Sequence, residues 1–180
     1  MRLFIAIIFN QEVKDHLFHI MSELKNSSIK GSFVDYNNLH LTLSFLGELP
    51  TAKKVMEAMD QTINKGNFKE FTLTIKDLGR FNRREGDILW VGIEHNEDLY
   101  YLQKCLTKEL LECGLEVEDR EYKPHLTLAR KAVMQTGFHM NEFWNQIPAI
   151  KQKVDKISLM KSERIHGELV YTEIYSVKLC

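Results

Sequence analysis

The chain has 180 residues, of which 44% are hydrophobic and 27% are charged. This composition is ordinary for a globular protein, and a chain of this length can bury a core without disulfides or metal ions. The formal net charge of −1 at pH 7 excludes a protein that coats nucleic acid through an excess of Lys and Arg, but it allows a small basic pocket.

The cysteines and the N-terminus restrict the class of protein further. The three cysteines, Cys105, Cys113 and Cys180, include no C-x-x-C pair, so neither a disulfide framework nor a zinc knuckle is indicated. The apolar run 3–9 is at the short limit for a signal peptide and lacks a small-residue cleavage site, so a buried strand is the better interpretation. No stretch is long enough to span a membrane, and we expect a cytoplasmic protein.

Hydrophobic patterns in the first half of the chain predict alternating strands and helices. The run 3–9 predicts a strand buried on both faces, and apolar residues at helical spacing predict a helix over 11–25. Asn10 and Thr51 each precede a helical pattern and are predicted to be N-caps. The other elements predicted in this half are a loop at 26–36, a strand at 39–46, a helix at 52–64 and a strand at 68–78.

The second half follows a basic segment at 79–86 and begins the same order again. Gly114 is predicted to end the long helix of this half. The predicted elements are a strand at 88–93, a helix at 96–113, a strand that contains 126–128, a helix at 138–146 and strands at 154–160 and 168–179.

The two halves are related by a nearly constant offset. The tetrapeptide His-Leu-Thr-Leu occurs at 40–43 and again at 125–128, so its two histidines are 125 − 40 = 85 positions apart. Shifting Phe4 by the same 85 positions reaches Leu89 in the corresponding predicted strand. An internal repeat of this kind indicates a pseudo-two-fold protein.

The repeat predicts an α+β fold with two similar lobes. We expect a single domain over 1–180, built from two interleaved lobes that correspond approximately to 1–86 and 87–180. Each lobe is expected to contain an antiparallel sheet with helices outside it, and the active site is expected in the cleft between the lobes.

The doubled tetrapeptide has a pattern that suits chemistry at a cleft. Because side chains alternate along a strand, His40 and Thr42 share one face while the leucines between and after them share the other. His125 and Thr127 have the same arrangement in the second copy. The leucines can anchor each strand in a core, and two imidazoles and two hydroxyls can then converge on one space.

Such a set of side chains is suited to phosphodiester cleavage. One imidazole can accept a proton from water and the other can donate one to the leaving oxygen, because histidine titrates near pH ~6.5. The hydroxyls can stabilise phosphoryl oxygens, and neither a metal nor a carboxylate is required. A single H-x-[ST] is weak evidence, since one histidine beside a strand is more often structural. The same tetrapeptide at matching places in a repeat favours catalysis.

Three stretches resemble the two-histidine phosphoesterases, and most closely the RNA 2′,3′-cyclic phosphodiesterase group, historically called 2′-5′ RNA ligases. Gly79-Arg80-Phe81 and Leu89-Trp90 also fit that group's middle section. The resemblance covers nearly the whole chain. The three stretches are Met1 to Ala6, Asn38 to Gly47 and Lys123 to Arg130.

The resemblance implies an activity and a division of labour. It implies hydrolysis of a terminal 2′,3′-cyclic phosphate of RNA to a 2′-phosphate, with reversible 2′-5′ RNA joining as a side reaction. His40 is then the proton donor and His125 the proton acceptor, a distinction that the near-symmetric motifs do not make by themselves. The expected partners are RNA 3′ ends or nucleotides carrying a 2′,3′-cyclic phosphate. We expect a monomer that needs no cofactor and no metal.

Three further residues are candidates for substrate binding. Arg130 matches a family arginine placed near the phosphate, yet strict alternation puts it on the face opposite His125, so it reaches the cleft only if the strand bulges or ends. Tyr122 and Phe45, like Tyr36, lie near the motifs and either stack a terminal base or pack in the core.

Two alternatives to the cyclic phosphodiesterase remain open from the sequence. One is a non-catalytic module that binds RNA ends, and the other is a phosphoesterase for another cyclic phosphate or for a 2′-5′ linkage. The basic cluster of Arg80, Arg83 and Arg84 is interpreted either as a contact with an RNA backbone or as a solvated hairpin loop.

Overall fold

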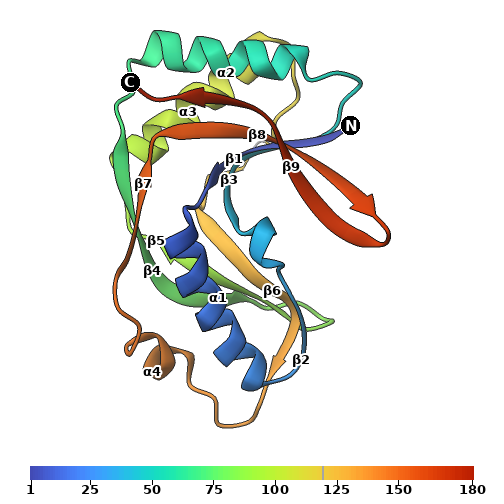
Figure 1. Ribbon diagram of the computed structural model, residues 1–180, viewed down its shortest axis with the longest axis vertical. Coiled ribbons are helices and arrows are strands. Elements are labelled where there is room, and N and C mark those ends of the chain that lie inside the picture. Colours follow the sequence, from blue (N-terminus) through green and yellow to red (C-terminus); the bar gives the residue numbers. More distant parts are fainter. Residues whose placement is uncertain (119) are drawn as a thin grey trace.

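The described residues form two antiparallel sheets, four α-helices and a short 3-10 helix at Tyr36–Asn38, which confirms the predicted α+β class (Figure 1). The structure is a computed structural model that describes residues 1–118 and 120–180. One sheet has the order β3-β1-β8-β9, with β1 at Arg2–Ile8, β3 at His40–Glu48, β8 at Lys156–Ile165 and β9 at Glu168–Lys178. The other has the order β2-β6-β5-β4-β7, with β2 at Ser28–Phe33, β4 at Phe71–Phe81, β5 at Asp87–Ile93, β6 at His125–Met134 and β7 at Ile150–Val154.

The helices lie on the outer sides of the two sheets, as predicted (Figure 1). Helices α2 (Lys53–Gly66) and α3 (Glu97–Glu112) pack on each other and contact β9 and β3 of the first sheet. Helix α1 (Gln11–Asn26) contacts β2 and β7 of the second sheet, and the short α4 (Met140–Trp144) contacts β4. None of the helices in the described ranges is both long and apolar enough to cross a membrane.

The repeat seen in the sequence is also present in the order of the strands. Adding 85 to the bounds of β1 gives 87–93, the bounds of β5, and adding 85 to those of β3 gives 125–133, which lies within β6. Adding 85 to the bounds of β4 gives 156–166, which corresponds to β8. However, β4 lies in the sheet of β5 and β6, whereas β8 lies in the sheet of β1 and β3. Each half of the chain therefore supplies two strands to the other half's sheet, β2 and β4 from the first half and β8 and β9 from the second.

Three local predictions were wrong for identifiable reasons. Residues 28–33 were predicted to be a loop, but they form the edge strand β2. The sequence of this strand is largely polar and shows no apolar alternation, and the strand forms because it pairs with β6. The strand predicted at 154–160 is two strands interrupted at the exposed Asp155. Thr51 is not the N-cap of α2, because Ala52 occupies that position and the Thr51 hydroxyl accepts only a long hydrogen bond of 3.3 Å from the Lys53 N–H.

Candidate active site

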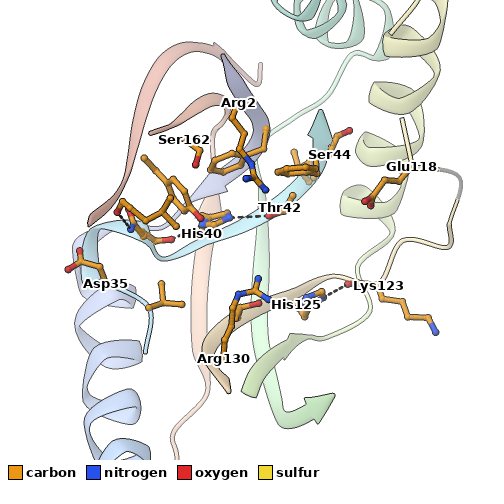
Figure 2. A pocket seen from close by; sticks show the side chains of 18 of the residues that line it. Arg2, Asp35, His40, Thr42, Ser44, Glu118, Lys123, His125, Arg130 and Ser162 are labelled. Carbon is orange, nitrogen blue, oxygen red and sulfur yellow. Dashed lines mark hydrogen bonds between the residues drawn. The ribbon is translucent and has the colours of Figure 1, made fainter. Parts of the chain in front are cut away.

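A cleft of about 1470 Å³ lies between the two sheets, and both copies of the tetrapeptide line it. His40 and Thr42 reach it from β3, and His125 and Thr127 reach it from β6. Figure 2 shows His40 and Thr42 on one side of this space, with His125 and Arg130 facing them from the other. The leucines of both copies are buried, as the alternation predicted. The structure thus brings all four predicted motif residues together.

Both histidines are held by the same backbone interaction. The Nδ1 atom of His40 lies 2.6 Å from the carbonyl oxygen of Asn38, and the Nδ1 atom of His125 lies 2.7 Å from that of Lys123. A carbonyl accepts only from an N–H, so Nδ1 carries a proton in each ring and Nε2 is left for chemistry. The Nε2 atom of His40 lies 3.0 Å from the hydroxyl oxygen of Thr42. Each imidazole is therefore oriented with its reactive nitrogen toward the cleft.

Four aromatic rings that were not among the predicted site residues pack against the two histidines. Phe4 of β1 and Tyr171 of β9 lie with ring centroids 4.8 and 5.3 Å from that of His40. Phe81 of β4 lies 5.3 Å from His125, edge to face, and Trp90 of β5 lies 6.3 Å from it. Phe81 and Trp90 belong to stretches that fit the resembled group, but aromatic residues in strands are usually core residues, so the hydrophobic pattern did not place any of the four rings beside the site.

The environment of His40 makes its protonated form unfavourable in the free protein. Burial is the largest effect and lowers the pKa of His40 below its ordinary value of 6.5. The hydrogen bond to the Asn38 carbonyl opposes this effect, while the positive charges of Arg130 and Lys14 lower the pKa further. His40 in the free protein is accordingly neutral at pH 7. An anion that enters the cleft would offset the positive charges and favour the protonated form.

A β-bulge in each copy explains how Arg130 reaches the cleft. Between β5 and β6 the pairing moves from Trp90 with Thr127 to Leu89 with Ala129, so β6 contains one extra residue. The alternation is reset by this residue, and Arg130 points to the same side as the histidine. Strict alternation predicts that Arg130 lies on the face opposite His125. The bulge is the condition under which Arg130 was expected to reach the cleft, and it is present.

The matching bulge in the first copy places Phe45 in the cleft. The pairing of β1 and β3 moves from Ala6 with Thr42 to Ile5 with Ser44. Phe45 then lines the cleft at the position that corresponds to Arg130, since 45 + 85 = 130, and its side chain is 37% exposed. The guanidinium carbon of Arg2 lies 5.2 Å from the centre of its ring. The pseudo-symmetric site therefore has an aromatic ring in one lobe where it has a cation in the other.

The hydroxyls of Tyr122 and Tyr36, the two tyrosines near the motifs, each donate a hydrogen bond within the protein. Tyr122 lines the cleft, and its hydroxyl donates to the backbone carbonyl of Thr42 at 3.0 Å, so it links the segment before β6 to β3. Burial raises the pKa of the Tyr122 phenol, which stays protonated as this bond requires. The Tyr36 hydroxyl donates to Asp15 at 2.7 Å, and Tyr36 is not among the residues that line the cleft.

All three arginines of the basic cluster line a second hollow beside the cleft, and Arg83 also lines the cleft itself. Arg80 lies 3.4 Å from Asp87. Within residues 1–118 and 120–180, no three His, Cys, Asp or Glu side chains are close enough together to hold a metal ion.

Comparison with known proteins gives the chain a family. The sequence profile of the 2′-5′ RNA ligase superfamily matches residues 13–166. An RNA 2′,3′-cyclic phosphodiesterase of Methanothermobacter thermautotrophicus is 28% identical over 184 residues, which cover 99% of this chain and 98% of the relative. One of Escherichia coli is 31% identical over 132 residues, covering 73% of this chain and 72% of that protein. The crystal structure of E. coli LigT complexed with 3′-AMP superimposes with a TM-score of 0.77 at 26% identity, covering 99% of this chain and 97% of that one. The chain belongs to the 2′-5′ RNA ligase superfamily.

Proposed function

We propose that this protein hydrolyses the 2′,3′-cyclic phosphate at the 3′ end of RNA, or of a nucleotide, to a 2′-phosphate and a free 3′-hydroxyl. The observation that supports this most is the pair of identically held imidazoles, His40 and His125, which face each other across one cleft. The names of the relatives support the substrate, since they are RNA 2′,3′-cyclic phosphodiesterases that match almost the full chain.

In the proposed mechanism the two histidines act as an acid and a base. His125 accepts a proton from water as the water oxygen attacks phosphorus, and His40 donates a proton to the 3′ oxygen as its bond to phosphorus breaks. The low pKa of His40 makes its cation a stronger acid than free imidazole. A bound phosphodiester anion offsets the charge of Arg130, and so favours protonated His40 in the complex.

Three side chains are proposed to stabilise the phosphoryl oxygens. The hydroxyls of Thr42 and Thr127 donate hydrogen bonds to the non-bridging oxygens, and the Arg130 guanidinium neutralises their charge. Thr42 is already next to Nε2 of His40 at 3.0 Å, so it can change from this partner to a phosphate oxygen. The exposed ring of Phe45 is proposed to stack on the terminal base.

The same site supports RNA joining by an exchange of nucleophile. If the 5′-hydroxyl of a second RNA replaces water, attack on the cyclic phosphate forms a 2′-5′ linkage while the 3′ oxygen leaves with a proton. No net bond energy has to be supplied, so no nucleotide cofactor is needed. The reaction is reversible because the 3′ oxygen of the product can attack the linkage and restore the cyclic phosphate.

Substitution of each histidine tests the proposal. His40→Ala and His125→Ala should each reduce kcat for a 2′,3′-cyclic nucleotide by about 10²–10⁴-fold, the usual contribution of a positioned acid or base, without a change in the circular dichroism spectrum. His16→Ala, on the exposed side of α1, is the matched control and should retain activity.

Three outcomes would contradict the proposal. Full activity in either histidine variant would exclude the acid–base pair, and loss of activity with EDTA would indicate a metal. Formation of a 3′-phosphate, detected by ³¹P NMR, would show that the 2′ oxygen leaves instead. A panel containing a cyclic phosphate derived from ADP-ribose and a 2′-5′ dinucleotide then establishes whether an RNA end is the preferred substrate.

A further inference from the structure

A second hollow, of about 440 Å³, lies beside the cleft at the tip of the β4–β5 hairpin. Its lining comes from that hairpin, from the edge strand β2 and from the end of β6 and the segment after it. Arg83 lines both this hollow and the catalytic cleft. The residues that line it are Lys30, Arg80, Arg83, Arg84, Glu85, Gly86, Asp87, Ala132, Val133, Met134, Gln135 and Phe138.

The hollow and the cleft share the same strands. On β2, Lys30 lines the hollow and Ser32 lines the cleft, so their side chains are on one face and about 6–7 Å apart along the strand. The guanidinium carbon of Arg83 lies 5.9 Å from the centre of the Phe81 ring, which in turn contacts His125 edge to face. The hollow therefore adjoins the cleft on the side of His125, with Arg83 between them.

The charges around the hollow favour a polyanion. Lys30, Arg83 and Arg84 form no ion pair within the described part of the chain, whereas both acids of the hollow have a cation partner. The hydrogen bond and charge of Lys131 lower the pKa of the Glu85 carboxyl, and Lys30 lies close enough to Glu85 to help lower it. Glu85 pairs with Lys131 at 2.8 Å and Asp87 pairs with Arg80 at 3.4 Å. The β4–β5 hairpin contributes no acid to the cleft. The acidic residues that line the cleft come from other elements, and they are Asp35, Glu48, Glu118, Glu121, Glu163 and Glu168.

The hairpin tip is held in place against β6. Its turn is closed by a hydrogen bond of 3.2 Å from the Gly86 N–H to the Arg83 carbonyl. Gly86 has a φ of +120°, and a Cβ atom there would lie 2.6 Å from the carbonyl carbon of Lys131. Only glycine permits this approach, so the turn that carries Arg83 and Arg84 packs closely against β6.

We propose that the groove formed by Lys30, Arg83 and Arg84 binds the sugar-phosphate backbone of the RNA that precedes the cyclic phosphate. This inference rests on the proposed function, because the cyclic end must occupy the cleft for the rest of the chain to leave along the hairpin. The groove makes an oligoribonucleotide a better substrate than a mononucleotide. Guanidinium and ammonium groups on an exposed path can contact phosphates without selecting a base sequence.

The double variant Lys30→Gln/Arg84→Gln tests this groove without changing any residue of the cleft. Two substrates are compared, a mononucleotide 2′,3′-cyclic phosphate and a hexaribonucleotide with the same terminal group. We expect kcat/KM for the hexamer to fall on the order of tenfold at low salt and that for the mononucleotide to be unchanged. The dependence of log(kcat/KM) on log[salt] for the hexamer should become shallower by about 1.4, since each lost phosphate contact contributes about 0.7 for a single strand.

The matched control removes two positive charges that line neither the hollow nor the cleft. Lys53→Gln/Lys69→Gln has the same net charge as the test variant, but its substitutions are on exposed residues at the start of α2 and after its end. This control should process the hexamer like the wild type. Equal kcat/KM of the test variant and the control on the hexamer would overturn the proposed role of the groove. Equal kcat/KM of the wild type on the hexamer and the mononucleotide would overturn it as well.

A binding measurement separates this inference from the proposed function. If the wild type turns over neither substrate, the proposed function fails. Fluorescence anisotropy with a labelled hexamer that ends in a 2′-phosphate then tests the groove directly. Weaker binding by the double variant than by the control supports the groove, and equal binding overturns it.

Discussion

At the scale of single residues, the two histidines have the same hydrogen bond but different surroundings. Each Nδ1 atom contacts the carbonyl oxygen two residues earlier in the chain. His40 additionally lies near two cations, Arg130 and Lys14, and its pKa is lowered by burial and by their charges. The pKa of His40 is thus set by burial and by residues that lie outside its own motif.

The lowered pKa of His40 is a testable property. A ¹H NMR titration of its Cε1 proton should give a value below 6.5, assigned by its absence in His40→Asn. Arg130→Gln should raise this pKa, because a positive charge is removed, and inorganic phosphate should raise it in the wild type. A value above 6.5 in the free protein would contradict the described environment.

The same shift predicts how stability changes with pH. A depressed pKa in the folded state means that the unfolded chain binds the proton first, so His40 contributes stability that is present above the unfolded value near pH ~6.5. That contribution is lost as the pH falls through the folded pKa. Urea unfolding of the wild type and of His40→Asn should therefore show a smaller loss of stability below pH 6.5 in the variant.

The division of labour between the histidines can be tested with a better leaving group. A 2′,3′-cyclic substrate with sulfur in place of the 3′ oxygen needs no proton on the leaving atom. If His40 is the donor, this substrate should restore activity to His40→Ala toward that of the wild type, while His125→Ala remains inactive. Rescue of His125→Ala instead would reverse the two roles.

At the scale of elements, Asn38 links the β8–β9 hairpin to the imidazole of His40. Its side-chain amide donates to the backbone carbonyl of Leu169 at 2.7 Å, and its own carbonyl accepts from His40. Figure 1 shows this hairpin projecting from the first sheet, and its residue Tyr171 packs edge to face on His40. A single buried amide therefore couples the position of the hairpin to that of the ring.

Removal of that amide should affect both stability and activity. Asn38→Ala leaves the carbonyl of Leu169 without its partner, which should lower the free energy of unfolding by about 1–3 kcal/mol. We also expect a lower kcat, because the hairpin no longer holds Tyr171 firmly against His40. Asn64→Ala, at an exposed position of α2 away from the cleft, is the control. A variant with unchanged kcat would show that the hairpin does not position the imidazole.

At the scale of the whole molecule, the exchange of β4 and β8 between sheets makes the two halves dependent on each other. Neither 1–86 nor 87–180 contains a complete sheet, and one buried core extends across both. We therefore propose that 1–180 is a single domain. The expectation of a monomer stays a prediction, for which light scattering should give a mass near 21.1 kDa.

Separation of the halves tests the single domain. We expect thermal unfolding of the full chain to be one cooperative transition, with coincident circular dichroism and tryptophan fluorescence changes. The fragments 1–86 and 87–180, expressed alone, should remain unfolded, because β4 would lose both of its partners, β5 and β7, and β8 would lose β1. An independently folded fragment would contradict the proposal.

The sequence by itself determined the repeat, most of the strands and helices, and the convergence of His40, Thr42, His125 and Thr127. These follow from local rules, since alternation assigns faces and a repeated motif at a constant offset implies equivalent places. Only the tertiary structure decided that Arg130 and Phe45 reach the cleft, because a bulge depends on the register with a neighbouring strand. It also decided the exchange of strands between the sheets, the formation of strand β2 and the aromatic surroundings of the histidines. Each of these depends on pairing and packing between distant segments, for which the local sequence pattern contains no signal.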